Sequence, residues 1–179
     1  MSEYTMKLDD TTEKHLTLLL FADVENARDV KTKLINGELR CCVLKASLIV
    51  DPFQVVVAAN KAALKEMHSR LTTKTVFTEI LFDLSLSKNI TQSLIKFGID
   101  DAERNILVAV IHSLDDKKSI VQKVVSSIKG QQVSIDKLKD YTDLKLVRKT
   151  YKIEDTELTV SNLVDSLVSR ISTKDFASY

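Results

Sequence analysis

The chain has 179 residues and a formal net charge of +1, with 44% hydrophobic and 28% charged residues. This composition is typical of one globular domain with its own core, and only three glycines and one proline leave little material for linkers. Because the net charge is close to zero, an RNA-binding site would depend on local clusters of lysine and arginine. We predict a single domain over residues 1–179, with flexible ends at about 1–12 and 173–179.

Secretion and membrane insertion are not expected. The chain does not start with a basic segment followed by an apolar run, and no apolar stretch reaches the roughly 18 residues of a membrane span. The two cysteines, Cys41 and Cys42, are sequence neighbours, between which a disulfide is strained and uncommon. We therefore expect two reduced thiols and a reducing compartment, the cytosol or the nucleus.

In the first half of the chain, apolar runs alternate with helical patterns. Leu16 to Phe21 is a short apolar run, typical of a central strand, and Glu25 to Ile35 has helical spacing and is followed by Asn36-Gly37. The segment 38–50 stays unassigned. Asp51 can cap a helix and Pro52 suits its first position, so a buried helix is predicted from Asp51 to Met67. A strand is predicted for Val76–Leu84, and a helix capped by Asn89 and ended by Gly98 for Ile90–Phe97.

The second half continues this alternation. The predicted elements are a strand at Ile106–Ile111, a helix at Asp116–Ile128, a brief strand at Gln132–Ile135, a short helix at Asp143–Lys149, a strand or extended link at Tyr151–Ile153, and an amphipathic C-terminal helix at about Thr156–Ile171. Strands separated by helices favour an α/β (α+β) domain, with a mixed β-sheet covered by helices.

Motifs for catalysis, metals and nucleotides are not evident. The histidines His15, His68 and His112 lack the close spacing of a zinc motif, and the isolated glycines form neither a phosphate loop nor a dinucleotide fingerprint. We therefore predict no catalytic residue, no metal site and no cofactor. Cys42 as a nucleophile beside a histidine is an alternative, although a packing role is more common. Asp100-Asp101 and Asp115-Asp116 are interpreted as capping carboxylates.

Several segments together resemble one known family. These are Leu16–Phe21 with Val24, Asn26 and Ala27, Val50-Asp51-Pro52-Phe53-Gln54, Val57–Ala62, Thr78-Glu79-Ile80, Asn89-Ile90, Lys96–Ile99, Lys149–Lys152 and Arg170–Asp175. In this order and spacing they resemble the TPRKB family, small subunits of the KEOPS (EKC) tRNA-modification complex that bind its kinase/ATPase subunit, PRPK. The resemblance spans nearly the whole chain, although none of its segments is a catalytic motif.

The resemblance implies that the C-terminal helix contacts the kinase. The candidate kinase-binding residues are Leu163, Val164, Leu167, Val168 and Ile171. Periodicity alone is equally typical of a helix that buries this stripe in the core of its own domain. We expect that Glu in place of Val168 or Ile171 leaves the fold largely intact and abolishes kinase binding.

The resemblance also implies contact with the single-stranded 3′ end of tRNA. The candidate tRNA-binding residues are Lys61, Lys65, Arg70, Lys74 and Lys96. Without the resemblance, scattered surface charge is the more common explanation for these residues. Arg148, Lys149 and Lys152 form an alternative basic strip. The family has a more basic run where this chain has Leu71–Val76, which weakens this assignment.

As a whole, the resemblance implies a non-catalytic KEOPS subunit in the cytoplasm and nucleus. It would bind and activate the kinase/ATPase subunit and help recruit tRNA for formation of N6-threonylcarbamoyladenosine next to the anticodon. Two alternatives remain open. One is a stand-alone regulator of a protein kinase outside tRNA modification, and the other is a small enzyme that uses Cys42 or the paired aspartates.

Overall fold

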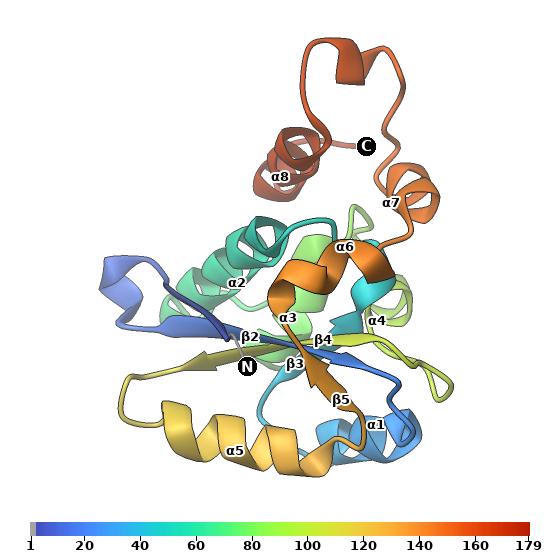
Figure 1. The fold of residues 1–179 in the computed structure, drawn as a ribbon. Coiled ribbons are helices and arrows are strands. Elements are labelled where there is room, and N and C mark those ends of the chain that lie inside the picture. The colour runs from blue at the N-terminus through green and yellow to red at the C-terminus, as the bar shows by residue number, and fades with distance from the viewer. Residues whose placement is uncertain (1–2) are drawn as a thin grey trace.

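The computed structural model describes residues 3–179, and it contains one five-stranded sheet with helices on both faces (Figure 1). The strands are β1 (Tyr4–Lys7), β2 (His15–Ala22), β3 (Cys42–Lys45), β4 (Ile106–His112) and β5 (Gln131–Val133). Their order is β1-β2-β4-β3, and β5 pairs with the C-terminal end of β2. The α+β fold class is confirmed. The sheet, expected to be mixed, has only antiparallel pairings among residues 3–179.

The predicted central strand is confirmed. β2 pairs along its length with β4, from His15 opposite His112 to Phe21 opposite Ile106. Successive side chains of a strand point to opposite faces, so Leu16, Leu18 and Leu20 enter one apolar cluster while Leu19 and Phe21 enter the other. The sheet therefore separates two hydrophobic cores.

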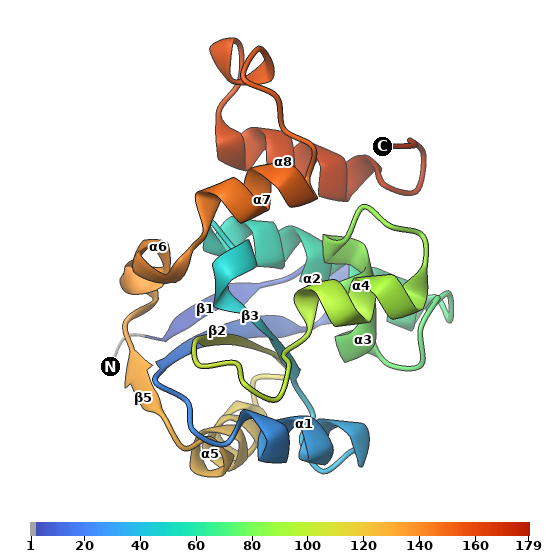
Figure 2. The ribbon, with the colours of Figure 1, turned by 90° about the vertical axis from the view of Figure 1, so that its right-hand side faces the viewer.

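The helices form unequal layers on the two faces of the sheet (Figures 1 and 2). The helices are α1 (Ala27–Ile35), α2 (Pro52–Met67), α3 (Val76–Leu84), α4 (Ile90–Phe97), α5 (Lys117–Ser127), α6 (Leu138–Tyr141), α7 (Leu144–Thr150) and α8 (Leu163–Thr173). Short 3-10 turns lie at Asp10–Thr12, Ala46–Leu48, Ile135–Lys137 and Glu157–Thr159. α1 and α5 cover one face and α2 lies across the other, with α8 packed on its outer side.

Helix α2 begins where the sequence predicts. The Asp51 side chain accepts a hydrogen bond from the backbone N–H of Phe53 at 2.9 Å, and Pro52 occupies the first turn. Ala58, Ala59 and Ala62 are fully buried. These small side chains allow α2 to pack closely between the sheet and its neighbouring helices.

The strand predicted at Val76–Leu84 is wrong, because this segment is helix α3. Thr75 and Thr78 form a capping box, in which the Thr75 hydroxyl accepts from the Thr78 N–H and the Thr78 hydroxyl accepts from the Thr75 N–H. Val76, Glu79, Ile80 and Asp83 are buried with helical spacing. The branched and aromatic side chains favour a strand locally, but the cap and the buried face determine a helix.

Two predictions near the C-terminus also need correction. The last helix begins at Leu163 rather than near Thr156, because Asn162 caps it, and the segment before it contains only the 3-10 turn Glu157–Thr159. Tyr151–Ile153 is neither a strand nor an extended link but a turn after α7, in which Lys152 has a φ of 54°.

The unassigned segment 38–50 contains β3 and a 3-10 turn, and β1 is a further strand that the sequence did not indicate. Residues 1 and 2 of the flexible start predicted at about 1–12 lie outside the described residues. No helix in the described part of the chain is long and apolar enough to cross a membrane.

Candidate functional site

Helix α8 is a separate layer whose apolar residues differ in burial. Leu167 and Ile171 are completely buried against the core that includes α2. Leu163, Val164 and Val168 are only partly buried. The predicted apolar stripe is therefore divided: two of its members are buried in the core, and three keep part of their surface exposed.

A charged contact holds the chain that precedes α8. The Arg170 guanidinium binds the Glu157 carboxylate at two points, with distances of 2.5 Å from Nη1 to Oε1 and 2.7 Å from Nη2 to Oε2. This hydrogen bonding lowers the pKa of Glu157 to about 2. Arg170 also donates to the Lys152 carbonyl at 3.2 Å, so that the turn after α7, the 157–159 turn and α8 are tied together.

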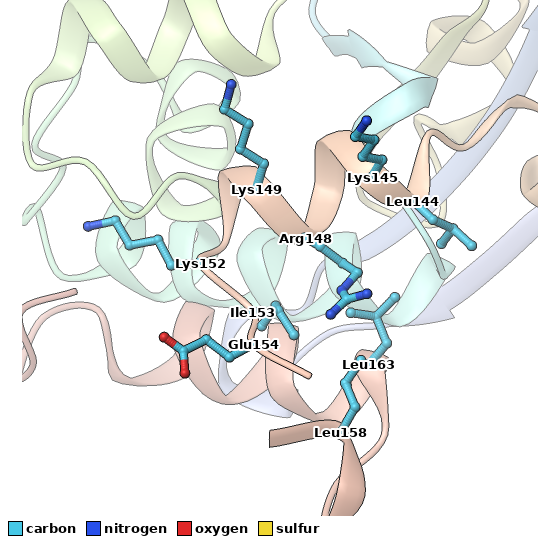
Figure 3. Close-up of a pocket in the computed structure, with 9 residues that line it drawn as sticks. All are labelled: Leu144, Lys145, Arg148, Lys149, Lys152, Ile153, Glu154, Leu158 and Leu163. Atoms are coloured by element: carbon cyan, nitrogen blue, oxygen red, sulfur yellow. The ribbon is translucent and has the colours of Figure 1, made fainter. Parts of the chain in front are cut away.

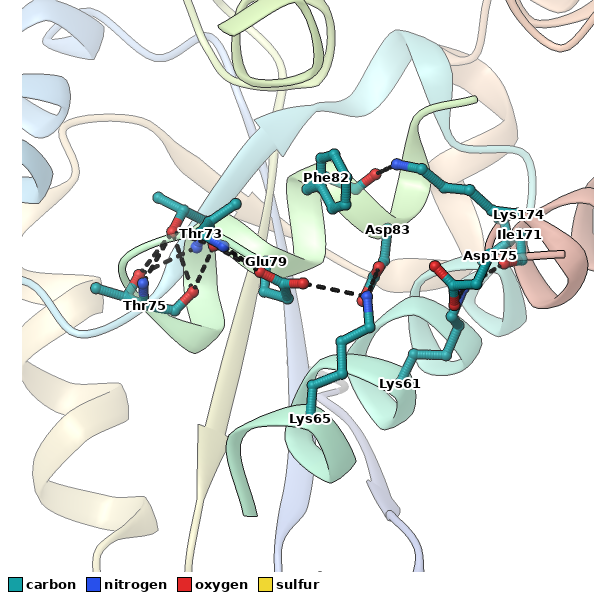
Figure 4. Close-up of polar contacts among 11 residues, drawn as sticks. Lys61, Lys65, Thr73, Thr75, Glu79, Phe82, Asp83, Ile171, Lys174 and Asp175 are labelled. Carbon is teal, nitrogen blue, oxygen red and sulfur yellow. Dashed lines mark hydrogen bonds and ion pairs between the residues drawn. The ribbon is translucent and has the colours of Figure 1, made fainter. Parts of the chain in front are cut away.

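Two of the predicted tRNA-binding lysines take part in internal contacts (Figure 4). The Lys65 ammonium lies 3.1 Å from Glu79 and 2.6 Å from Asp83, and both carboxylates are fully buried. Lys61 donates to the Ile171 carbonyl at 2.7 Å and lies 3.2 Å from Asp175. Both ammonium groups thus join α2 to neighbouring elements and already have anionic or carbonyl partners, which leaves little capacity for phosphate.

The same cluster contains a third cation, Lys174, which is fully buried. Its ammonium donates to the Phe82 carbonyl and lies 3.4 Å from the centroid of the Phe82 ring. Burial lowers the pKa of Lys174 to about 8, with Lys61 and Lys65 adding to the effect and Asp83 opposing it. Burial also raises the pKa of Asp83, although Lys65 opposes that shift.

Lys74 lies at a groove beside the edge strand β3. The groove has a volume of about 680 Å³, and Cys41, Val76 and Phe77 contribute to its apolar wall. Lys14 and Arg40 line the same groove. Within residues 3–179 the charged groups of Lys14, Arg40 and Lys74 have no hydrogen-bond or ion-pair partner. The predicted Arg70 is exposed in the loop that leads to Lys74.

Lys96 belongs to a different region. It lines a hollow of 430 Å³ together with Lys152 and Tyr179. Lys152 also lines a groove beside α7 with Arg148 and Lys149, the alternative basic strip of the sequence (Figure 3). The five predicted tRNA-binding residues are therefore not gathered at one place: Lys61 and Lys65 lie in the buried cluster, and Lys96 lies on the side near α7. Lys74 lines the β3 groove, and Arg70 lies in the loop before it.

The residues of the enzyme alternative are in unsuitable environments. Both thiols are buried, and burial raises the pKa of Cys41 to about 12 and that of Cys42 well above its ordinary value. Such thiols are poor nucleophiles. Asp100 accepts a hydrogen bond from the Ala102 N–H at 3.0 Å, as expected for a turn carboxylate. In the described residues no group of three or more His, Cys, Asp or Glu side chains is arranged to hold a metal ion.

Fold and surface together define a small α+β protein with partly exposed apolar residues on α8 and separate basic grooves. Comparison with known proteins then shows the family. The profile described as "Kinase binding protein CGI-121" matches residues 21–175, and this chain belongs to that family. The family is non-catalytic, in agreement with the expectation that the chain is not an enzyme.

Relatives in animals and fungi are similar over most of their length. One from Danio rerio, "EKC/KEOPS complex subunit TPRKB", is 32% identical over 173 residues, which cover 97% of this chain and 98% of the relative. "EKC/KEOPS complex subunit CGI121" from Yarrowia lipolytica is 27% identical over 146 residues, or 80% and 83%. The Schizosaccharomyces pombe protein with the corresponding description is 24% identical over 169 residues, or 92% and 96%.

The sequence did not indicate the full membership of either basic groove. Lys14 and Arg40 line the same groove as Lys74 because the sheet and the loop before α3 bring them together. Part of the apolar wall beside them is formed by residues of α3, and it therefore depends on this segment being a helix. Leu144 and Lys145 were likewise not selected, although they lie one turn before the basic strip of α7. A charge cluster formed across elements leaves no signal in local spacing.

Proposed function

We propose that this chain is the kinase-binding subunit of a KEOPS complex and that it uses the partly exposed apolar residues of α8 for this contact. The observation that carries the proposal is that Leu163, Val164 and Val168 are only partly buried, whereas Leu167 and Ile171 of the same helix are fully buried. Membership of the CGI-121 family and the names of its relatives support the partner. By this proposal the chain works in the cytoplasm and nucleus and activates the kinase without contributing catalytic groups.

The test is calorimetric titration of the purified KEOPS kinase subunit with two charge variants on one helix. We expect Val168→Glu to weaken kinase binding about tenfold or more, because a carboxylate would be buried at the interface without a partner. The matched control is Ser169→Glu, which places the same charge at the next, exposed position. Equal affinity of Val168→Glu and the natural chain would contradict the proposed face.

For Ile171→Glu, the structure predicts a different effect on stability from the one expected from the sequence. Its side chain is fully buried, so Ile171→Glu places a carboxylate in the core and should unfold or strongly destabilise the chain. Loss of kinase binding in this variant would therefore be uninformative about contact. For this reason, the kinase test uses Val168 and Ser169 and monitors thermal unfolding of both variants.

We further propose that the chain helps recruit tRNA through the β3 groove, where Arg40, Lys74 and Lys14 surround an apolar wall that includes Phe77. The unpartnered cations supply phosphate contacts, and an aromatic ring suits stacking of a single-stranded base. Lys61 and Lys65 are assigned to the fold instead. By this proposal, Lys74 contacts the RNA together with Lys14 and Arg40, which are distant from it in sequence.

The RNA assignment is tested by comparing Arg40→Gln/Lys74→Gln with Lys118→Gln/Lys123→Gln, a control pair on α5 with the same change in charge. We expect only the first pair to lower tRNA affinity and to reduce the salt slope by about two. Removal of the tRNA 3′ end should abolish the difference. If both pairs lower the affinity equally, the attraction is general and the groove is not the site.

The stand-alone kinase regulator remains the second candidate function. Such a regulator would bind its kinase through the same α8 residues, but it would bind neither tRNA nor other KEOPS subunits. Affinity purification of the tagged chain from its native cells separates the two. Recovery of the kinase with tRNA and further KEOPS subunits favours the first function, and recovery of a kinase alone favours the second.

A further inference from the structure

The groove beside α7 combines an aliphatic floor with a basic rim (Figure 3). It has a volume of 660 Å³. Its apolar lining residues are Leu144, Ile153, Leu158 and Leu163, and its charged ones are Lys145, Arg148, Lys149, Lys152 and Glu154. Leu144 is 54% exposed although it is a large apolar side chain. Neither of the contacts proposed above uses this floor as a whole.

The charges on the rim are only partly matched. Arg148 pairs with Asp155, so its guanidinium already has a carboxylate. Lys145, Lys149 and Lys152 have no side-chain partner within residues 3–179. Lys145 and Lys149 are four residues apart on α7 and extend from the same side of the helix (Figure 3). Among the described residues, three unpartnered lysines and one unpartnered carboxylate, Glu154, therefore line the groove. In Figure 3 Lys145 and Lys149 extend to the side of α7 away from Leu158 and Leu163.

The chemistry of the floor distinguishes between anionic ligands. Sites for single-stranded nucleic acid combine cations with aromatic side chains on which bases stack. Every apolar residue that lines this groove is aliphatic, and such a surface fits leucine, isoleucine or valine side chains better than bases. One cation of α7, Arg148, already pairs with a carboxylate of the chain itself, Asp155.

We propose that the α7 groove binds an acidic segment of a partner protein, in which single aliphatic side chains are separated by aspartate or glutamate residues. The aliphatic side chains contact Leu144, Leu158 and Leu163, and the carboxylates meet Lys145, Lys149 and Lys152. Burial of apolar surface supplies the part of the affinity that resists salt, while the lysines supply a salt-dependent part. This site is separate from the β3 groove and meets the α8 face only at Leu163.

The proposal is tested by fluorescence anisotropy with the full chain and the labelled peptide Asp-Glu-Leu-Asp-Glu-Leu-Asp-Glu. We expect binding that weakens about tenfold in Lys145→Glu/Lys149→Glu. The control Lys118→Glu/Lys123→Glu changes two exposed lysines on α5 by the same charge and should bind as the natural chain does. Leu144→Ser, or serine in place of both peptide leucines, should also weaken binding.

Exchanging the charges of the peptide and of the protein gives a second, more specific test. A peptide with lysine in place of its acidic residues should bind Lys145→Glu/Lys149→Glu better than it binds the natural chain. The proposal is overturned if the acidic peptide does not bind, if both double variants lose affinity equally, or if labelled oligouridine alone responds to the α7 variants. Kinase binding measured on the same variants should be unchanged, so failure here is distinguishable from failure of the α8 assignment.

Discussion

At the scale of single residues, the structure separates lysines that are free from lysines that are already used. Lys65 pairs with both Glu79 and Asp83, and Glu79 also accepts from the backbone and hydroxyl of Thr73 at 2.7 and 2.8 Å. These bonds lower the pKa of Glu79 although burial acts in the opposite direction. A basic residue next to an apolar helix face is therefore not in itself a binding residue.

We expect Lys65→Met to lower the free energy of unfolding by about 3–5 kcal/mol, because it leaves two buried carboxylates without their cation. Urea denaturation at neutral pH measures this change. The control Lys74→Met removes an exposed, unpartnered lysine and should alter stability by about 0.5 kcal/mol or less. Equal stabilities of the two variants would show that the Lys65 contacts carry no net energy.

At the scale of elements, α3 shows how a cap can determine the type of a segment. Its sequence is rich in branched and aromatic residues, but Thr75 and Thr78 satisfy each other's N–H groups at its first turn. Burial at helical spacing then places Glu79 and Asp83 against Lys65 of α2. Helix α3 is therefore stabilised in part by contacts with a residue of another helix, Lys65.

Replacement of the capping residue tests this interpretation. Thr75→Ala should destabilise the chain by about 1 kcal/mol, because the Thr78 N–H loses its acceptor. Thr72→Ala, at an exposed position in the preceding loop, is the matched control and should have little effect. The two variants are compared by thermal unfolding. A destabilisation of Thr72→Ala as large as that of Thr75→Ala would argue against the capping box.

At the scale of the whole molecule, the end of the chain is fixed to the centre of the fold. Lys174 follows α8 and contacts Phe82 of α3, and Lys61 of α2 binds the carbonyl of Ile171 and the carboxylate of Asp175. The layer that carries the proposed kinase-binding face is thus anchored by buried charges as well as by Leu167 and Ile171. Its position relative to α2 depends on both kinds of contact.

The buried Lys174 gives the whole molecule a specific dependence on pH. Its pKa is about 8 in the folded chain and about 10.4 in an unfolded one, so the unfolded chain binds more protons between these values. The free energy of unfolding, relative to that of Lys174→Met, should therefore rise as the pH increases from about 8 to 10. Urea denaturation across this range measures it. A constant difference between the two chains would show that Lys174 titrates normally.

Much of the secondary structure was predictable, because its signals are local. The apolar run of β2, the Asp51-Pro52 start of α2 and the Asn89 cap of α4 are formed by neighbouring residues. The wrong assignments, α3 and the turn at Tyr151–Ile153, occur where burial and packing decide between local alternatives. Candidate sites were less predictable, because a linear sequence does not show that Lys61 and Lys65 form ion pairs within the fold.

The sequence by itself determined the α+β class, the central strands, helix α2 and a resemblance to kinase-binding subunits, since these depend on composition, periodicity and ordered motifs. Only the tertiary structure decided which apolar residues of α8 stay partly exposed, which lysines form ion pairs within the fold, and which cations share a groove. The physical reason is that exposure and charge pairing are properties of segments brought together by folding. Lys14, Arg40 and Lys74 are distant along the chain, yet they line one surface.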